Sequence, residues 1–262
     1  MDLGITGRVA LVAGATGGIG HAVARALSAE GARVVLSGRR GDLAARQADE
    51  LGSSTGADTL GVTLDLTDPD SISAAVEQSR RAFGAIDILV VNGGGPPPST
   101  AVGLGPDTTG PASVLLLDGP LRLIGQCLPG MRDREWGRIV AIGSSAVQAP
   151  IPGLTTSAMY RSALASYLKL LSREVAADGV TVNMVLPGRI DTERVAQLDA
   201  GKADKQGVPA TEVRRASEAT IPTGRYGEPP EIAAAVTFFC GAPASFITGE
   251  QLRVDGGMVS GF

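Results

Sequence analysis

The chain has 262 residues, of which 44% are hydrophobic and 3% aromatic, and its formal net charge is −4. This length accommodates one large α/β domain, or two small ones, with a sizeable core. The acidic balance, with no basic stripe and interleaved aromatics, excludes nucleic-acid binding. No apolar run approaches the roughly 20 residues of a membrane span, and the N-terminus lacks a signal-peptide pattern, so we expect a soluble, cytoplasmic protein with no membrane partner.

The few cysteines and the single histidine exclude further kinds of site. Cys127 and Cys240 lie in apolar runs of helical spacing, so we expect reduced core thiols. His21 is the only histidine, which excludes a Ser-His-Asp triad and a histidine-based metal site. We predict that no metal is bound.

The first predicted strand, Val9–Val12, runs into a glycine-rich turn. Gly14, Gly18 and Gly20 have the spacing G-x-x-x-G-x-G, and a run of helical spacing begins at Ile19. Such a strand, turn and helix allow the backbone to approach a pyrophosphate at the helix N-terminus. An ordinary strand-to-helix turn is the alternative, and the later strands decide between the two.

Strands and helices alternate along the rest of the chain. Further strands are predicted over Arg33–Ser37, Thr59–Leu64, Ile86–Val91, Arg138–Ile142, Val180–Leu186 and Gln251–Val254. Helices are predicted over about Asp42–Leu51, from near Ser71, and over Pro120–Met131, Thr155–Ala176 and Glu231–Cys240. The alternation predicts a single doubly wound Rossmann-type α/β domain over residues 1–262, with a mainly seven-stranded parallel sheet and helices on both faces.

One stretch, about 193–219, is polar, charged and flanked by glycines and prolines. It is either a solvated insertion or a helical lid near the substrate site, and the sequence leaves both open.

In a doubly wound sheet, ligands bind beyond the carboxyl ends of the strands. At these ends the chain carries small, polar or glycine residues throughout: 14–20, 37–40, 65, 92–95, 144–145 and 187–192. This agreement favours a nucleotide cofactor over a coincidental turn.

Six segments, in the expected order, resemble the short-chain dehydrogenase/reductase family over essentially the whole chain, and most closely its 3-oxoacyl-carrier-protein reductase-like branch. The matching segments are 14–20, 87–94, 137–145, 181–188, 225–233 and 254–257. The resemblance implies hydride transfer between a nicotinamide and a carbonyl or carbinol carbon. It also implies a catalytic set of a tyrosine, a lysine four residues later, a serine and a helix asparagine.

This chain departs from that catalytic set. Counts back from Thr181 and forward from Ser144 both place the tyrosine position at Ser157 and the lysine position at Arg161. The asparagine position falls on Leu116, so only Ser144 matches the family. The chain is similar to a small branch of reductase-like members with Ser-x-x-x-Arg in place of Tyr-x-x-x-Lys.

The substituted residues still have usable chemistry. Ser157 and Arg161 share a helix face, and an arginine there can donate to ribose hydroxyls and favour a nearby oxyanion. The proton would come from water ordered by Ser144, Ser157 and Arg161, or from Tyr160, which lies about one turn along and about 60° around the helix. The alternative is that Ser157 has no role and Tyr160 packs on a neighbouring subunit.

The second strand favours NADP(H) over NAD(H), because Arg39 follows it and no acid occurs until Asp42. The resemblance assigns cofactor contacts to Gly14, Thr16, Gly18, Ile19, Gly20, Asp65, Leu66, Asn92, Gly93, Arg161, Pro187, Gly188, Ile190 and Thr192.

We therefore expect an NADP(H)-dependent carbonyl reductase or alcohol dehydrogenase with an altered proton path and a small-molecule substrate. A non-redox isomerase, lyase or cyclase, and a catalytically impaired cofactor-binding subunit, are the alternatives. By analogy with the family, helices around Pro120–Met131 and Ser157–Ala176 would pair subunits into a homodimer or homotetramer.

Overall fold

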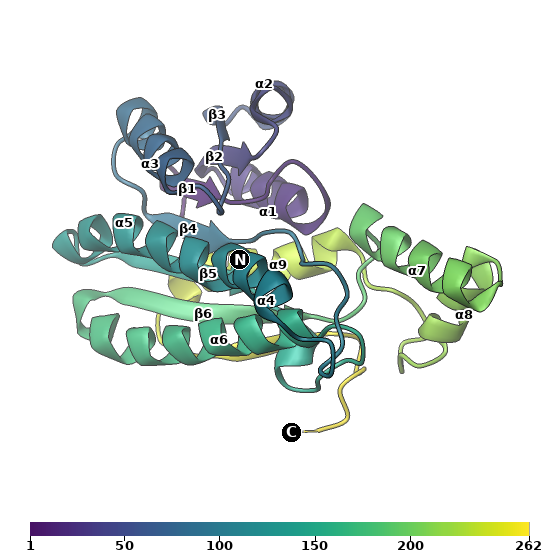
Figure 1. Ribbon diagram of the computed structural model, residues 1–262. Helices are drawn as coiled ribbons and strands as arrows, with labels where there is room; N and C mark the ends of the chain where they lie inside the picture. Colours follow the sequence, from purple (N-terminus) through teal and green to yellow (C-terminus); the bar gives the residue numbers. More distant parts are fainter. Residues whose placement is uncertain (262) are drawn as a thin grey trace.

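The computed structural model describes residues 1–261, and its core is one seven-stranded parallel sheet (Figure 1). The strand order is β3-β2-β1-β4-β5-β6-β7, and every pairing is parallel. The strands are β1 (Val9–Val12), β2 (Arg33–Gly38), β3 (Thr59–Thr63), β4 (Ile88–Val91), β5 (Gly137–Ile142), β6 (Val180–Pro187) and β7 (Gln251–Val254). The predicted doubly wound sheet is confirmed.

Helices cover both faces of this sheet. They are α1 (Gly18–Ala29), α2 (Gly41–Thr55), α3 (Pro69–Phe83), α4 (Pro106–Ser113), α5 (Gly119–Asp133), α6 (Thr155–Val175), α7 (Glu193–Gln206), α8 (Ala210–Glu218) and α9 (Pro229–Cys240). Side chains alternate across the strands: Leu11 belongs to the core cluster that includes residues of α3, α5 and α6, whereas its neighbour Val12 belongs to the cluster that includes residues of α1, α2 and α9. Burial on both faces explains why the central strands are continuously apolar.

The helix before β5 is longer than predicted, which corrects the expected range Pro120–Met131. It begins at Pro106 and continues through α4, a π-helical turn over Val114–Asp118 and α5. The N–H of Gly119 donates to the carbonyl of Val114, five residues back, and Pro120 has no N–H to donate. Prolines and glycines inside this helix disrupt the local pattern from which its start was predicted.

The start of α3 also differs slightly, because it lies at Pro69 and not near Ser71. The carboxylate of Asp68 accepts a hydrogen bond from the N–H of Asp70 at 2.9 Å and caps the helix. Aspartate followed by proline is a favourable helix start, since proline at the first helical position loses no intrahelical bond.

Residues 193–219 contain α7 and α8, which lie apart from the sheet on the right of Figure 1. Helix α7 begins after Thr192, whose hydroxyl accepts from the N–H of Val195 at 3.4 Å. Within residues 1–261 no helix combines the length and the apolar character that crossing a membrane requires.

Candidate functional site

The glycine-rich turn between β1 and α1 has no room for side chains. Gly14 has φ +61°, and a Cβ there would lie 2.9 Å from Nδ2 of Asn92. A Cβ at Gly20 would overlap the carbonyl oxygen of Gly14. Because backbone atoms cannot yield as a flexible side chain can, both positions require glycine. The turn thus brings the start of α1 directly against the end of β1.

The start of α1 suits a phosphate group. Gly17 precedes the helix and supplies no side-chain cap, so the first N–H groups of α1, from Gly18 to Gly20, have no such partner. A Cβ at Gly17, or at Gly94 after β4, would meet no described atom within 4 Å, so there is open space at both. Unpartnered N–H groups beside open space at a helix N-terminus fit the diphosphate of a dinucleotide.

Thr16 packs against the end of β2, and Arg39 directly follows this strand. A Cβ at Gly38 would lie 2.9 Å from Cγ2 of Thr16, which shows how closely the turn packs on this strand. The next residue, Arg39, is exposed, and its guanidinium forms no hydrogen bond or ion pair with residues 1–261. An unpaired guanidinium here fits the 2′-phosphate that distinguishes NADP from NAD.

Four predicted cofactor contacts follow the ends of β3 and β4: Asp65, Leu66, Asn92 and Gly93. Asn92 donates from Nδ2 to the carbonyls of Ala13 and Gly14, at 3.2 and 3.1 Å. A Cβ at Gly93 would lie 3.2 Å from Cδ1 of Leu66, so these two residues form one wall. The carboxylate of Asp65 accepts instead from its own loop, from the N–H and hydroxyl of Thr67.

The segment after β6 leads into α7 and packs against the glycine turn. Gly188 follows Pro187, at the end of β6, and a Cβ on it would lie 2.8 Å from Cα of Asp255. Ile190 is buried and bridges to Gly227. Thr192 lies against the turn, because a Cβ at Gly18 would be 3.3 Å from its Cγ2. Of the four residues predicted in this segment, Thr192 is therefore the one that contacts the glycine turn directly.

Ser157 and Arg161 are in contact on α6. Nε of Arg161 donates to Oγ of Ser157 at 3.3 Å, and Nη1 donates to the carbonyl of Ile142, at the end of β5, at 2.8 Å. Burial lowers the pKa of Arg161 to about 10, and the charge of Arg194 contributes to the same shift. The guanidinium is therefore still a cation at neutral pH.

The other predicted catalytic residues make fewer contacts. Oγ of Ser144, two residues beyond Ile142, accepts from the N–H of Ala146 at 3.2 Å, which leaves its own proton to donate. Tyr160 forms no side-chain hydrogen bond within residues 1–261. Leu116 is buried in the π-helical turn and has no polar side chain to hold a water.

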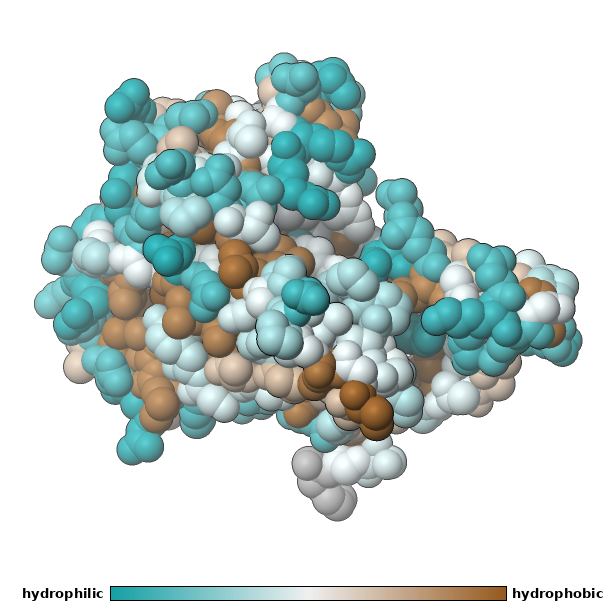
Figure 2. Space-filling view, in the orientation of Figure 1, coloured by the Kyte–Doolittle hydropathy of each residue, from teal (hydrophilic) through white to brown (hydrophobic). Residues whose placement is uncertain are grey.

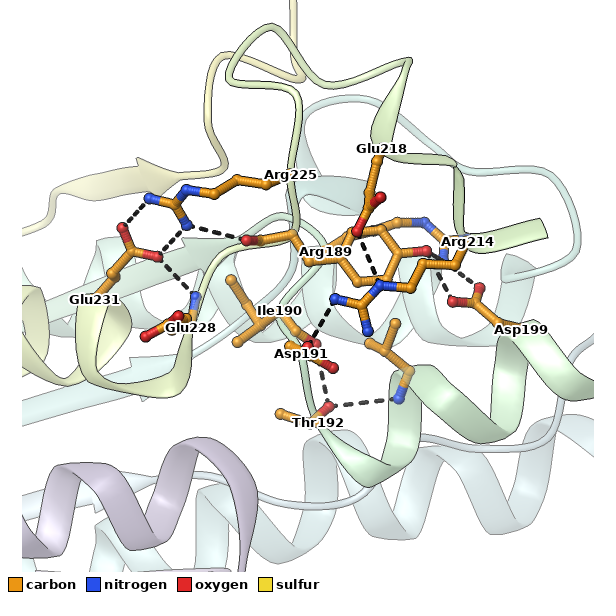
Figure 3. A network of polar contacts seen from close by, with 12 residues as sticks. Arg189, Ile190, Asp191, Thr192, Asp199, Arg214, Glu218, Arg225, Glu228 and Glu231 are labelled. Carbon is orange, nitrogen blue, oxygen red and sulfur yellow. Dashed lines mark hydrogen bonds and ion pairs between the residues drawn. The ribbon is translucent and has the colours of Figure 1, made fainter. Parts of the chain in front are cut away.

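Sequence reasoning missed a polar network that holds α7 and α8 (Figure 3). Nη1 of Arg189 lies 2.7 Å from Oδ1 of Asp199, and the hydroxyl of Tyr226 donates to Oδ2 at 2.8 Å. Asp199 is only 4% exposed. Its spacing of four from the buried Ala203 was the available signal, because it places Asp199 on the inner face of α7.

The chain matches known proteins over almost its whole length. The model of the family described as enoyl-(acyl carrier protein) reductase matches residues 14–259. The 3-oxoacyl-[acyl-carrier-protein] reductase FabG of Salmonella typhimurium is 37% identical over 252 residues, covering 96% of this chain and 97% of the relative. The FabG of Vibrio cholerae is 35% identical over 256 residues, covering 98% and 99%.

Solved structures give the same result. The L-sorbose reductase of Gluconobacter frateurii, complexed with NADPH and L-sorbose, is 31% identical and superposes with a TM-score of 0.94 over 100% of both chains. A variant actinorhodin polyketide ketoreductase with NADPH is 32% identical, with a TM-score of 0.91 over 96% of this chain and 97% of the other. The chain therefore belongs to the short-chain dehydrogenase/reductase family of NAD(P)-dependent oxidoreductases.

Proposed function

We propose that this protein is an NADP(H)-dependent carbonyl reductase or alcohol dehydrogenase, similar to 3-oxoacyl reductases, with an altered proton path. The supporting observation is the contact between Arg161 and Ser157, anchored on the carbonyl of Ile142. By the counts from Thr181 and Ser144, this cation and this hydroxyl stand where the family resemblance expects lysine and tyrosine.

NADP(H) fits the residues described above. The turn over 14–20 and the start of α1 would hold the diphosphate, Arg39 the 2′-phosphate and Arg161 the nicotinamide ribose. The relatives complexed with NADPH support this cofactor. When bound, the nicotinamide supplies or accepts the hydride.

This chain's own residues would stabilise the developing negative charge and supply the proton. The Arg161 cation stabilises negative charge developing on the substrate oxygen. Ser144 can donate its proton to that oxygen and hold it in place. A serine hydroxyl is a far weaker acid than a phenol, so the proton comes from water held by Ser144 and Ser157, or from Tyr160.

The direct test restores the family pair with the double variant Ser157→Tyr and Arg161→Lys. A positioned general acid contributes about 10²–10⁴-fold in rate, so turnover of a ketone panel with NADPH should rise by a factor in this range. Arg161→Ala should weaken both NADPH binding and activity. Arg173→Ala, exposed near the end of the same helix, is the matched control. If Ser144→Ala and Arg161→Ala both leave activity intact, the site assignment is wrong.

A second candidate is a cofactor-binding subunit with little or no turnover. It is favoured by the contact of Arg161 with the hydroxyl of Ser157, which is a much weaker acid than a phenol. Fluorescence titration separates the two functions: tight NADPH binding without oxidation by any ketone supports the subunit.

We further propose that α5 and α6 pair two copies of the chain into a homodimer or homotetramer. Figure 2 shows apolar surface gathered around these helices, and Val114, Met159 and Leu170 are exposed on the π-helical turn and α6. Light scattering after size-exclusion chromatography tests this, and Leu170→Glu should shift the protein toward monomer.

A further inference from the structure

A second arginine reaches toward the same region from α7. Nη2 of Arg194, in the first turn of α7, donates to the carbonyl of Pro96 at 2.8 Å, across to the segment that follows β4. A Cβ at Gly95 would lie 3.4 Å from the same nitrogen. Arg194 therefore spans from α7 to the segment after β4. The surface is hollowed between the body of the molecule and α7 and α8 (Figure 2).

Neither Arg194 nor Arg161 has an acidic partner. The ion pairs found among residues 1–261 include neither residue, and their hydrogen-bond partners are carbonyls and one hydroxyl. Nearby acids are engaged elsewhere: Asp191 pairs with Arg214 at 2.7 Å, and Glu193 accepts from Gln197.

Two cations without a counter-ion repel each other unless an anion joins them. Arg194 contacts the segment that follows β4 and Arg161 contacts the end of β5, and because these two strands are paired, both cations lie at the same edge of the sheet. The positive end of α7 adds to the same potential. This arrangement attracts a negatively charged group.

The position of the pair favours substrate over cofactor as the source of that group. The cofactor's diphosphate is matched by the start of α1, and its 2′-phosphate by Arg39. Arg161 instead contacts Ser157 and the end of β5, near Ser144. On Arg194, Nε and Nη1 form no hydrogen bond with residues 1–261, which leaves guanidinium donors for a carboxylate.

We propose that Arg194 binds the carboxylate of the substrate, with the charge of Arg161 adding to the attraction, and that the substrate is an oxo acid. This inference rests on the proposed reductase function. In the forward direction hydride adds to the carbonyl carbon, the C=O electron pair passes to oxygen, and oxygen takes a proton. The products are a hydroxy acid and NADP⁺.

Binding of a non-reducible probe tests the carboxylate site without turnover. Calorimetry should show that malonate binds and that neutral malonamide does not. Arg194→Met should weaken malonate binding at least about 10-fold, the effect of losing one charge-assisted contact. Arg194→Lys, which keeps the charge, should weaken malonate binding by less than Arg194→Met does. Arg215→Met, exposed on α8, is the matched control and should bind malonate as the parent does.

Equal binding of malonate and malonamide, or an unchanged affinity in Arg194→Met, overturns the proposal. NADPH titration of the same variants separates the two possible anions: if Arg194→Met weakens NADPH as strongly as malonate, the arginine serves a cofactor phosphate and the proposal fails. If malonate binding requires Arg194 but the parent binds no NADPH, the carboxylate site stands and the reductase function falls.

In the active enzyme, kcat/KM for 2- and 3-oxo acids should exceed that for their methyl esters, and Arg194→Met should abolish this preference.

Discussion

Arg189 and Asp199 form an ion pair of 2.7 Å that joins the segment after β6 to α7. Tyr226 completes the unit, because its hydroxyl donates to the same carboxylate and its ring lies under the guanidiniums of Arg189 and Arg214, at 5.6 and 4.8 Å from the ring centre. Burial raises the pKa of the Tyr226 hydroxyl, which therefore keeps its proton for this bond. Hydrogen bonds and an ion pair thus tie α7 to the segment after β6 that is predicted to contact the cofactor.

Asp199→Asn is expected to loosen this unit. Asparagine keeps the size of the side chain but removes the charge that Arg189 and Tyr226 share, leaving buried donors poorly satisfied. A loss of about 1–3 kcal/mol in the free energy of unfolding is expected, together with faster proteolysis between α7 and α8. Urea unfolding and limited trypsin digestion measure both. Glu77→Gln, which breaks the exposed pair with Arg81, should change stability by only about 0.3–0.5 kcal/mol. Equal effects of the two variants would contradict the structural role of Asp199.

The glycine turn offers a matched pair of substitutions. Gly20→Ala should prevent NADPH binding and lower the thermal midpoint, because the added methyl group meets the Gly14 carbonyl. Gly17→Ala should leave stability close to that of the parent, because its methyl group enters open space. Thermal unfolding and NADPH fluorescence distinguish them. A Gly20→Ala protein as stable as Gly17→Ala would show that the turn is less tightly packed than described.

The sheet and most helices were predictable, because parallel strands buried on both faces leave continuous apolar runs between helical patterns. The long helix before β5 was predicted too short, since Pro111, Pro120 and the π-helical turn interrupt the 3.6-residue period. A prediction from residue spacing assumes a single helical period, so it fails for a helix that changes from α-helical to π-helical hydrogen bonds and back.

The candidate site was predictable where fixed spacing carries the information. Counting from two motifs placed Ser157 and Arg161 on one helix face, and the structure brings their side chains into contact. Their catalytic roles remain predictions. The contacts of Arg194 with Pro96 and of Arg189 with Asp199 join segments whose side chains show no shared local pattern. Such tertiary contacts become visible only once the chain is folded.

Arg39→Asp should reverse the cofactor preference. The exposed guanidinium is suited to a 2′-phosphate, whereas a carboxylate repels that phosphate and accepts from the ribose hydroxyl. We expect NADPH affinity to fall about 10- to 100-fold, the range for one charge-assisted contact, and NADH affinity to rise. Fluorescence titration with both nucleotides measures the ratio. Arg46→Asp, exposed on α2, should leave the ratio unchanged; an unaltered ratio in Arg39→Asp would remove the basis for NADP preference.

Both cysteines are expected to be unreactive in the folded protein. Burial raises the pKa of Cys127 and of Cys240 to about 12, so almost no thiolate is present at neutral pH. A chromogenic disulfide reagent at pH 8 should release no rapid signal from native protein and two equivalents after denaturation in guanidinium. Rapid labelling of either thiol without denaturant would contradict the core positions of these residues.

The charge of Arg161 sets an expected pH limit on function. Its pKa is lowered to about 10, so the cation is present at pH 7 and is lost as pH rises toward 10. NADPH affinity should therefore be level from about pH 6 to 8.5 and then weaken on the alkaline side. Arg161→Met should bind NADPH more weakly at neutral pH and lack this alkaline decline. An alkaline decline of equal size in Arg161→Met would assign the titration to another group and remove Arg161 from the cofactor site.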